Sequence, residues 1–217
     1  MKVVSLWSGG KDSCFACYKA KSQGFEVVSL INFTDYSGKG SLSHGLSADI
    51  IQRQSRLIGI PFLQKSMPKE GYRDAFLALI QEYKTKEGVE GIVFGDIYLQ
   101  EHRDWIDKVC AELKVKAILP IWTKDTKGLI KEIIDSGFKT IVVSVKKGIL
   151  EKEWLGRRID YEFIKDLEKI GDIDLCGEKG EFHTFVYDGP IFKKPVEFIA
   201  GEKVLKDDHW FLELFSK

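Results

Sequence analysis

The stretch Ser8-Gly9-Gly10-Lys11-Asp12-Ser13 decides the fold that we expect from this sequence. It follows a short apolar run at residues 3–7 that is typical of a buried strand. It leads into an amphipathic stretch at residues 12–23 that predicts a helix. Glycines let the backbone approach an anion closely, and the start of the helix presents unpaired N–H groups and a positive dipole end to that anion.

The side chains of this stretch fit the same interpretation. Ser8 and Ser13 offer hydroxyl donors, and Lys11 offers a full positive charge. Asp12 stands where it can cap the first turn of the helix. We therefore predict that residues 8–13 bind phosphate; the alternative is an ordinary turn before a well-capped helix. The spacing is neither that of the Walker loop nor the Gly-x-Gly-x-x-Gly of a dinucleotide site.

Outward from this stretch, apolar runs alternate with amphipathic stretches over two thirds of the chain. The expected strands are residues 3–7, 26–33, 60–63, 91–95, 117–121 and 140–145, and the expected helices are residues 12–23, 48–58, 70–86, 101–113 and 125–136. This alternation predicts an α/β fold with a parallel five-stranded sheet and helices on both faces. Runs such as Ile92-Val93-Phe94 and Ile141-Val142-Val143 lack polar alternation, which is typical of strands covered on both faces.

The pattern changes after about residue 147. Residues 151–170 are charged and predict mostly helix, and residues 174–194 are dense in glycine, glutamate and aromatic side chains. We expect a larger domain at residues 1–147 and a smaller C-terminal α+β domain at residues 148–217 that packs on the sheet.

Composition narrows the class of protein. The chain has 217 residues, and its 33 lysines and arginines balance its 33 aspartates and glutamates, so its charge gives no argument for binding nucleic acid or a membrane surface. No apolar run approaches the roughly 20 residues of a membrane-spanning helix, and the first residues do not resemble a signal peptide. We expect a cytoplasmic protein with no membrane or nucleic-acid partner.

Cys14 and Cys17 form a Cys-x-x-Cys pair, which can be a redox or metal motif. The pair lies inside the helix that follows the glycine turn, and no second pair of cysteines or histidines stands at zinc spacing. We favour plain packing, since free cysteine is commonly buried as a small hydrophobe.

Ser-Gly-Gly-Lys-Asp-Ser after the first strand resembles the pyrophosphate loop of the N-type ATP pyrophosphatases, whose fold is the Rossmann-like fold of the adenine nucleotide alpha hydrolases. The resemblance implies cleavage of ATP between the α and β phosphates, an adenylate intermediate and release of pyrophosphate. Further segments are similar to one branch, the diphthine–ammonia ligase family and its bacterial and archaeal relatives. They are Gly95-Asp96 with Glu101 and Arg103, Pro120-Ile121-Trp122 with Asp125, Trp154-Leu155-Gly156-Arg157, and Cys176-Gly177-Glu178-Lys179-Gly180-Glu181-Phe182-His183.

The resemblance implies an ATP-dependent amide-forming ligase with ATP and Mg²⁺ as cofactors. In the family's reaction a diphthine carboxylate on the translation elongation factor attacks the α phosphate, and ammonia captures the acyl-adenylate to give an amide, AMP and pyrophosphate. Residues 1–147 would then bind ATP and residues 148–217 the acceptor; family habit alone suggests a homodimer. The sequence departs from the family pattern at Ser43-His44-Gly45 and at His102, so the chemistry carries over more fully than the acceptor.

Gly95 and Asp96 end an apolar strand at the edge where parallel sheets bind their ligands. We expect Gly95 to contact ATP. For the catalytic carboxylate of Asp96 two roles are open: it holds Mg²⁺ that bridges the phosphates, or it orients the amine nucleophile. A turn residue without a role in the site is the structural alternative.

Glu178, Glu181 and His183 converge in one short segment, and residues 181 and 183 share a face if the segment is a strand. Such a cluster can bind metal, deprotonate ammonium as a general base, or hold a charged group of the acceptor. A solvated polar hairpin is the alternative. With the resemblance we expect these three side chains to be catalytic.

Three further side chains are candidates for binding substrate. His44 lies in a loop, residues 34–45, that can close over a ligand, and Arg103 and Arg157 can counter phosphate charge. Each is equally a common kind of surface residue. The superfamily also implies that backbone amides around Leu30 read the adenine.

Three functions stay open at this point. The leading one is the amide-forming ligase. The second is the same adenylation on another small molecule or on tRNA. The third is a nucleotide-binding sensor without catalysis, against which the intact Lys11, Asp12, Ser13 and Asp96 argue.

Overall fold

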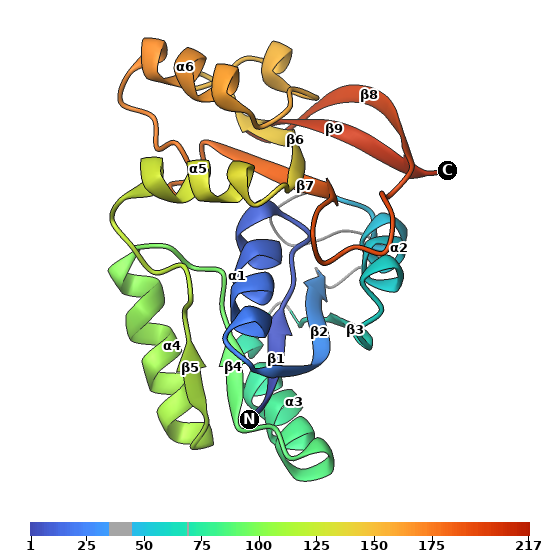
Figure 1. Ribbon diagram of the computed structural model, residues 1–217, viewed down its shortest axis with the longest axis vertical. Helices are drawn as coiled ribbons and strands as arrows, with labels where there is room; N and C mark the ends of the chain where they lie inside the picture. Colours follow the sequence, from blue (N-terminus) through green and yellow to red (C-terminus); the bar gives the residue numbers. More distant parts are fainter. Residues whose placement is uncertain (35–44, 69) are drawn as a thin grey trace.

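A computed structural model describes residues 1–34, 45–68 and 70–217 of the chain. Its lower part in Figure 1 is a sheet of parallel strands in the order β3-β2-β1-β4-β5. The strands are β1 (Lys2–Leu6), β2 (Glu26–Thr34), β3 (Phe62–Ser66), β4 (Gly91–Val93) and β5 (Lys116–Ile118). The expected α/β fold with a parallel five-stranded sheet is confirmed.

Helices cover both faces of this sheet, as the sequence predicts. One face packs against α1 (Lys11–Ser22), α2 (Ala48–Ile58) and α5 (Thr126–Asp135), and the other packs against α3 (Tyr72–Glu87) and α4 (Gln100–Leu113). Neighbouring residues of one strand point to opposite faces of the sheet: Val3 packs in the apolar cluster with α1, α2 and α5, and Val4 packs in the cluster with α3 and α4. Both are fully buried, which is why the strand reads as continuously apolar.

The upper part of Figure 1 is a second, antiparallel sheet in the order β7-β6-β9-β8. Its strands are β6 (Lys139–Lys146), β7 (Phe182–Asp188), β8 (Phe198–Lys206) and β9 (His209–Ser216). Helix α6 (Tyr161–Ile170) lies at the top of the molecule, preceded by the 3-10 helix η1 (Lys152–Trp154).

One expectation about the strands is wrong. The run at residues 140–145 was expected among the parallel strands, but β6 pairs antiparallel with both β7 and β9. The reason is that β6 is buried along almost its whole length, from Thr140 to Val145. A strand covered on both faces has the same unbroken apolar pattern in either kind of sheet, so periodicity could not assign it.

None of the helices in the described part of the chain is long and apolar enough to cross a membrane.

Candidate functional site

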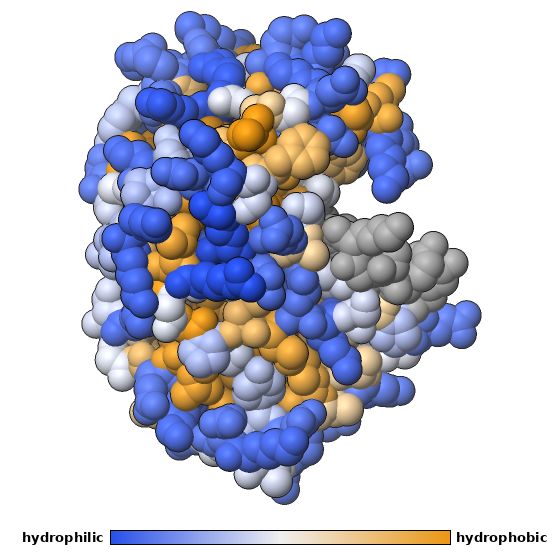
Figure 2. Space-filling view, turned by 90° about the vertical axis from the view of Figure 1, so that its right-hand side faces the viewer, coloured by the Kyte–Doolittle hydropathy of each residue, from blue (hydrophilic) through white to orange (hydrophobic). Residues whose placement is uncertain are grey.

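The loop between β1 and α1 borders a cavity of about 390 Å³ that both parts of the molecule line. Figure 2 shows the outline of the molecule notched between these upper and lower parts. Gly9 has a φ of +84°, and a Cβ there would meet the Gln54 side chain at 3.0 Å, so the turn requires glycine. Ser13 Oγ accepts a hydrogen bond from the Ser8 N–H at 3.2 Å and donates one to the Gly10 carbonyl at 3.1 Å.

The residue that caps the start of α1 makes no side-chain hydrogen bond to the helix. Gly10 occupies the capping position and offers no side chain, so the expectation that Asp12 caps the helix is wrong. Asp12 instead accepts a hydrogen bond from Lys11 Nζ through Oδ2, at 2.9 Å. Unpaired N–H groups in the first turn of a helix can bind phosphate. Here the Gly10 N–H already donates to Ser8 Oγ at 3.3 Å and the Lys11 N–H to Thr184 Oγ1 at 3.1 Å.

Gln54 of α2 ties this loop to both sheets. Its side chain is fully buried. Nε2 donates to the Gly9 carbonyl at 3.0 Å and to the Val186 carbonyl of β7 at 2.6 Å, while Oε1 accepts from Trp7 Nε1 at 2.8 Å. Val186 also donates its N–H to the Gly9 carbonyl at 3.0 Å. The position of the loop therefore depends on contacts from both parts of the molecule.

Lys11 brings a buried positive charge to the cavity. Its side chain is 2% exposed, and Nζ donates to the Cys176 carbonyl as well as to Asp12. Nζ also lies 5.3 Å from the centre of the Phe182 ring. Burial lowers the pKa of Lys11, but the charge and hydrogen bond of Asp12, together with the charges of Cys176 and Glu178, outweigh burial and leave the pKa above its ordinary value. The ammonium group therefore stays charged and available to phosphate.

The segment from Asp174 to Glu181 is folded around two carboxylates. Asp174 Oδ1 accepts the N–H of Cys176 at 2.8 Å and that of Glu178 at 3.2 Å. Glu181 accepts the N–H of Asp174 and that of Lys179, each at 3.0 Å. Glu181 is buried and does not line the cavity, so its visible role is to shape the segment.

Glu178 is the carboxylate of this segment that faces the cavity. Its Oε1 accepts the N–H of Ile97 at 3.0 Å, which ties it to the turn between β4 and α4. Burial raises the pKa of Glu178 to about 7, and the nearby charges of Asp12 and Asp96 act in the same direction. A carboxyl group with this pKa can both give and take a proton near neutral pH.

Asp96 also lines the cavity and is paired with a side chain that the sequence did not single out as functional. Its Oδ1 is 2.9 Å from Nδ1 of His102, in the first turn of α4, and both residues line the cavity. This hydrogen bond raises the pKa of His102. Gly95 lets the turn after β4 pack closely against the start of α1, because a Cβ at residue 95 would lie 2.9 Å from the Ser13 nitrogen.

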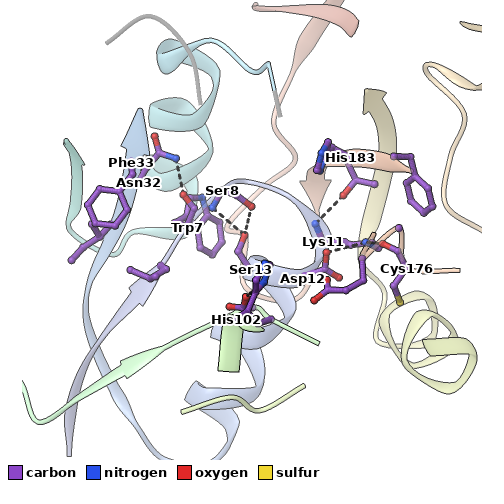
Figure 3. Close-up of a pocket in the computed structure, with 18 of the residues that line it drawn as sticks. Trp7, Ser8, Lys11, Asp12, Ser13, Asn32, Phe33, His102, Cys176 and His183 are labelled. Carbon is purple, nitrogen blue, oxygen red and sulfur yellow. Dashed lines mark hydrogen bonds and ion pairs between the residues drawn. The ribbon is translucent and has the colours of Figure 1, made fainter. Parts of the chain in front are cut away.

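The opposite end of the cavity is lined by aromatic and amide side chains. Figure 3 shows Trp7, Asn32 and Phe33 at one end, Ser8 between, and Lys11, Cys176 and His183 at the other. Asn32 Nδ2 donates to the Trp7 carbonyl at 2.7 Å, which fixes the end of β2 beside the loop. An aromatic and amide surface next to a phosphate loop suits a purine ring.

His183 of β7 lines the polar end. Burial lowers the pKa of His183 to about 4, and the positive charge of Lys11 adds to the effect. The imidazole is therefore neutral at pH 7. The hydroxyl of its neighbour Thr184 accepts a hydrogen bond from the Lys11 N–H at 3.1 Å, so β7 also contacts the Ser8–Ser13 loop next to His183.

Several expected site residues lie away from the cavity. Leu30 is buried in the core, and its N–H donates to the Pro61 carbonyl. Arg103 pairs with Asp107 at 2.8 Å, and Arg157 pairs with Asp166 at 2.8 Å. None of these three lines the cavity. His44 falls outside the described residues.

Of the two aspartates that line the cavity, Asp12 fits a magnesium ion better than Asp96. Among the described residues no group of three or more histidine, cysteine, aspartate and glutamate side chains is arranged to hold a metal. Mg²⁺ commonly binds one or two carboxylates together with substrate phosphates. Asp12 Oδ1 is buried without a hydrogen-bond partner beside the phosphate loop, whereas Asp96 Oδ1 is already bonded to His102.

The cysteines are free and buried, which agrees with packing. Burial raises the pKa of Cys14, and it raises the pKa of Cys17 to about 11. The thiol of Cys176, beside the cavity, likewise has a raised pKa because of burial. Thiols in this state are poor nucleophiles.

Comparison with known families gives matches over nearly the whole chain. Residues 1–117 match the model of the diphthamide synthase N-terminal domain, and residues 125–215 match that of the diphthamide synthase C-terminal domain.

Individual relatives include two diphthine–ammonia ligases and, over a shorter stretch, a tRNA-modifying enzyme. A diphthine–ammonia ligase of Danio rerio is 29% identical over 233 residues, covering 97% of this chain and 91% of the relative. One of Schizosaccharomyces pombe is 27% identical and covers 94% of this chain, which spans only 37% of that longer protein. A tRNA-specific 2-thiouridylase of Lysinibacillus sphaericus is 31% identical over 87 residues, or 39% of this chain and 23% of the relative.

Proposed function

Since the chain belongs to the diphthamide synthase family, we propose that it is an ATP-dependent ligase that adenylates a carboxylate and transfers ammonia to it. The proposed acceptor is diphthine, which the names of its relatives give, and the family resemblance implies that the diphthine is carried by a translation elongation factor. The observation that carries the proposal is the placement of the Ser8–Ser13 loop, Lys11 and Glu178 around one cavity.

The first step joins the acceptor carboxylate to AMP. A carboxylate oxygen forms a bond to the α phosphorus, and the bond from that phosphorus to the bridging oxygen of the β phosphate breaks. The leaving pyrophosphate keeps the electron pair. The start of α1 and the ammonium group of Lys11 stabilise its growing negative charge. Asp12 would hold Mg²⁺, which neutralises phosphate charge when it is bound.

The second step replaces AMP with nitrogen. Ammonia attacks the acyl carbon, and the bond from that carbon to the phosphate oxygen of AMP breaks. Two protons leave the nitrogen between ammonium and the neutral amide, so the site needs groups that accept protons near neutral pH. Glu178, whose pKa burial raises to about 7, meets this need.

The test is a product analysis. Elongation factor bearing diphthine is incubated with the protein, ATP, Mg²⁺ and ammonium, and the factor is examined by mass spectrometry. We expect conversion of the diphthine acid to its amide with equal amounts of AMP and pyrophosphate. ADP and phosphate as products would overturn the adenylation. If AMP and pyrophosphate form only with a different acceptor, that acceptor rather than diphthine is the substrate.

A second candidate is adenylation of tRNA, which the local similarity to a thiouridylase favours. Sulfur transfer would call for a reactive thiolate, whereas burial raises the pKa of Cys14, Cys17 and Cys176. Incubation with unmodified tRNA, ATP and a sulfide donor separates the two candidates, because the ligase should release no AMP with tRNA.

A further inference from the structure

The turn between β4 and α4 gathers three proton-binding groups on one side of the cavity. Asp96 lies in the turn itself, and His102 lies in the first turn of α4. Glu178 arrives from the other part of the molecule and is tied to the same turn through the N–H of Ile97. All three side chains line the cavity.

The hydrogen bond between Asp96 and His102 fixes which nitrogen of the imidazole is basic. Asp96 Oδ1 lies 2.9 Å from Nδ1, so a neutral His102 carries its proton on Nδ1 and donates it to the carboxylate. The lone pair then belongs to Nε2. A carboxylate that orients an imidazole in this way makes the other ring nitrogen a better base.

The charges around His102 favour a small cation. Asp96, Glu178 and Glu101 all act on the imidazole, and each is acidic. Around Glu178 stand Asp12, Asp96 and Lys11. Lys11 is already engaged by Asp12 and by the Cys176 carbonyl.

We propose that His102, oriented by Asp96, is the base that deprotonates ammonium, and that Glu178 binds the same ion. The inference rests on the proposed function. Asp96 acts as a positioning residue, while His102 and Glu178 touch the nitrogen.

Ammonium gives one proton to Nε2 of His102, and the nitrogen lone pair that this frees forms the bond to the acyl carbon. The bond from that carbon to the AMP oxygen breaks, and AMP leaves with the electron pair. The nitrogen then carries one proton too many, and the Glu178 carboxylate accepts it. Solvent takes both protons before the next turnover.

Hydroxylamine tests this assignment because it is a much weaker base than ammonia and is largely neutral at pH 7. It can attack the acyl-adenylate without a base to deprotonate it first. We expect His102→Gln to lower amide formation from ammonium by about 10²-fold or more, the usual contribution of a general base, while hydroxamate formation from hydroxylamine stays near the wild-type rate. Saturating ammonium should not restore the rate.

The chain offers a matched control. His209 of β9 pairs with Asp208 through Nδ1 and Oδ1 at 2.7 Å, the same arrangement as His102 with Asp96, but it does not line the cavity. His209→Gln should leave both reactions near the wild-type rate. An equal fall with both nucleophiles in His102→Gln, or no fall with ammonium, would overturn the proposal.

A binding measurement keeps the inference separate from the proposed acceptor. The imidazole signals of His102, assigned by their loss in His102→Gln, are followed by NMR in the ATP-bound protein. Ammonium chloride should shift them at concentrations where sodium chloride does not. If wild-type protein forms no product with either nucleophile, the proposed function fails, and this titration still decides the ammonium site. A shift with tetramethylammonium equal to that with ammonium would overturn the inference, since that ion has no proton to give.

Discussion

The lower and upper parts of the molecule line the same cavity with different segments. The lower part contributes the Ser8–Ser13 loop after β1, the end of β2 and the turn after β4, which carry the side chains of Lys11, Asp12, Asp96 and His102. The upper part contributes side chains, above all Glu178, His183 and Thr184. The proposed phosphate site therefore lies within the lower part, whereas the proposed proton-handling groups come together only when the upper part brings Glu178 to the turn after β4.

The largest effect should follow from a change on the lower side. Asp12→Asn removes the carboxylate that pairs with Lys11 and that would hold Mg²⁺. We expect ATP turnover to fall by about 10²–10³-fold, as for the loss of one electrostatic contact in a transition state. Asp49→Asn is the control, because Asp49 also lies in the first turn of a helix but is exposed and distant from the cavity. Near-normal turnover in Asp12→Asn would contradict the assignment of the loop.

The next effect tests whether the two parts depend on each other. Gln54→Leu leaves Trp7 Nε1 and the Val186 carbonyl without their buried partner. Such losses cost about 1–3 kcal/mol for each unsatisfied group, so we expect unfolding by denaturant at a clearly lower midpoint and weaker ATP binding. Gln52→Leu on the exposed side of the same helix is the control. If the two variants unfold alike, the loop does not depend on this contact.

A smaller effect concerns the acidic group on the upper side. The folded-state pKa of Glu178, about 7, lies above its ordinary value of 4.5, so protonation favours the folded state. The stabilising contribution is complete below pH 4.5 and is lost as the pH rises through 7. Glu178→Gln should therefore be more stable than the wild type above pH 7, by about 1–2 kcal/mol after allowance for solvent screening.

Thermal unfolding of the two proteins at pH 4 and at pH 8 measures this difference. The stabilities should converge at pH 4. A variant that is less stable than the wild type at pH 8 would show that the Glu178 carboxylate is not disfavoured by its surroundings.

The smallest effect is expected far from the cavity. Arg157 pairs with Asp166 and lies 4.4 Å from the Trp154 ring centre, so Arg157→Ala should lower stability by about 0.5–1 kcal/mol. Turnover of ATP and acceptor should be unchanged. A rise in KM for the acceptor with stability unchanged would instead restore the substrate-binding role that the family resemblance implies for Arg157.

The sequence predicted the lower side well because its signals are local. A strand, the Ser8–Ser13 turn and a helix follow one another directly in the chain, and Gly95-Asp96 ends a buried strand. Gly9 and Gly95 are glycines for reasons that only the packing shows, namely the approach of Gln54 and of the Ser13 nitrogen.

The upper side was harder because its contacts join distant positions. Glu178 meets the N–H of Ile97 across 81 residues, and Gln54 meets Val186 across 132. No periodicity in the chain encodes such pairs. Glu181 looked equivalent to Glu178 in the sequence, yet it folds inward onto Asp174 and Lys179. His102 carried one visible signal, the departure from the family pattern at that position.

The central claim is that the acceptor carboxylate is adenylated, and isotope transfer tests it most directly. The acceptor is prepared with heavy oxygen in its carboxylate and is incubated with the protein, ATP, Mg²⁺ and ammonium. The account predicts that one heavy oxygen appears in the phosphate of AMP, because the acyl carbon keeps its other oxygen when ammonia displaces AMP. Amide formed while AMP contains no heavy oxygen would contradict it.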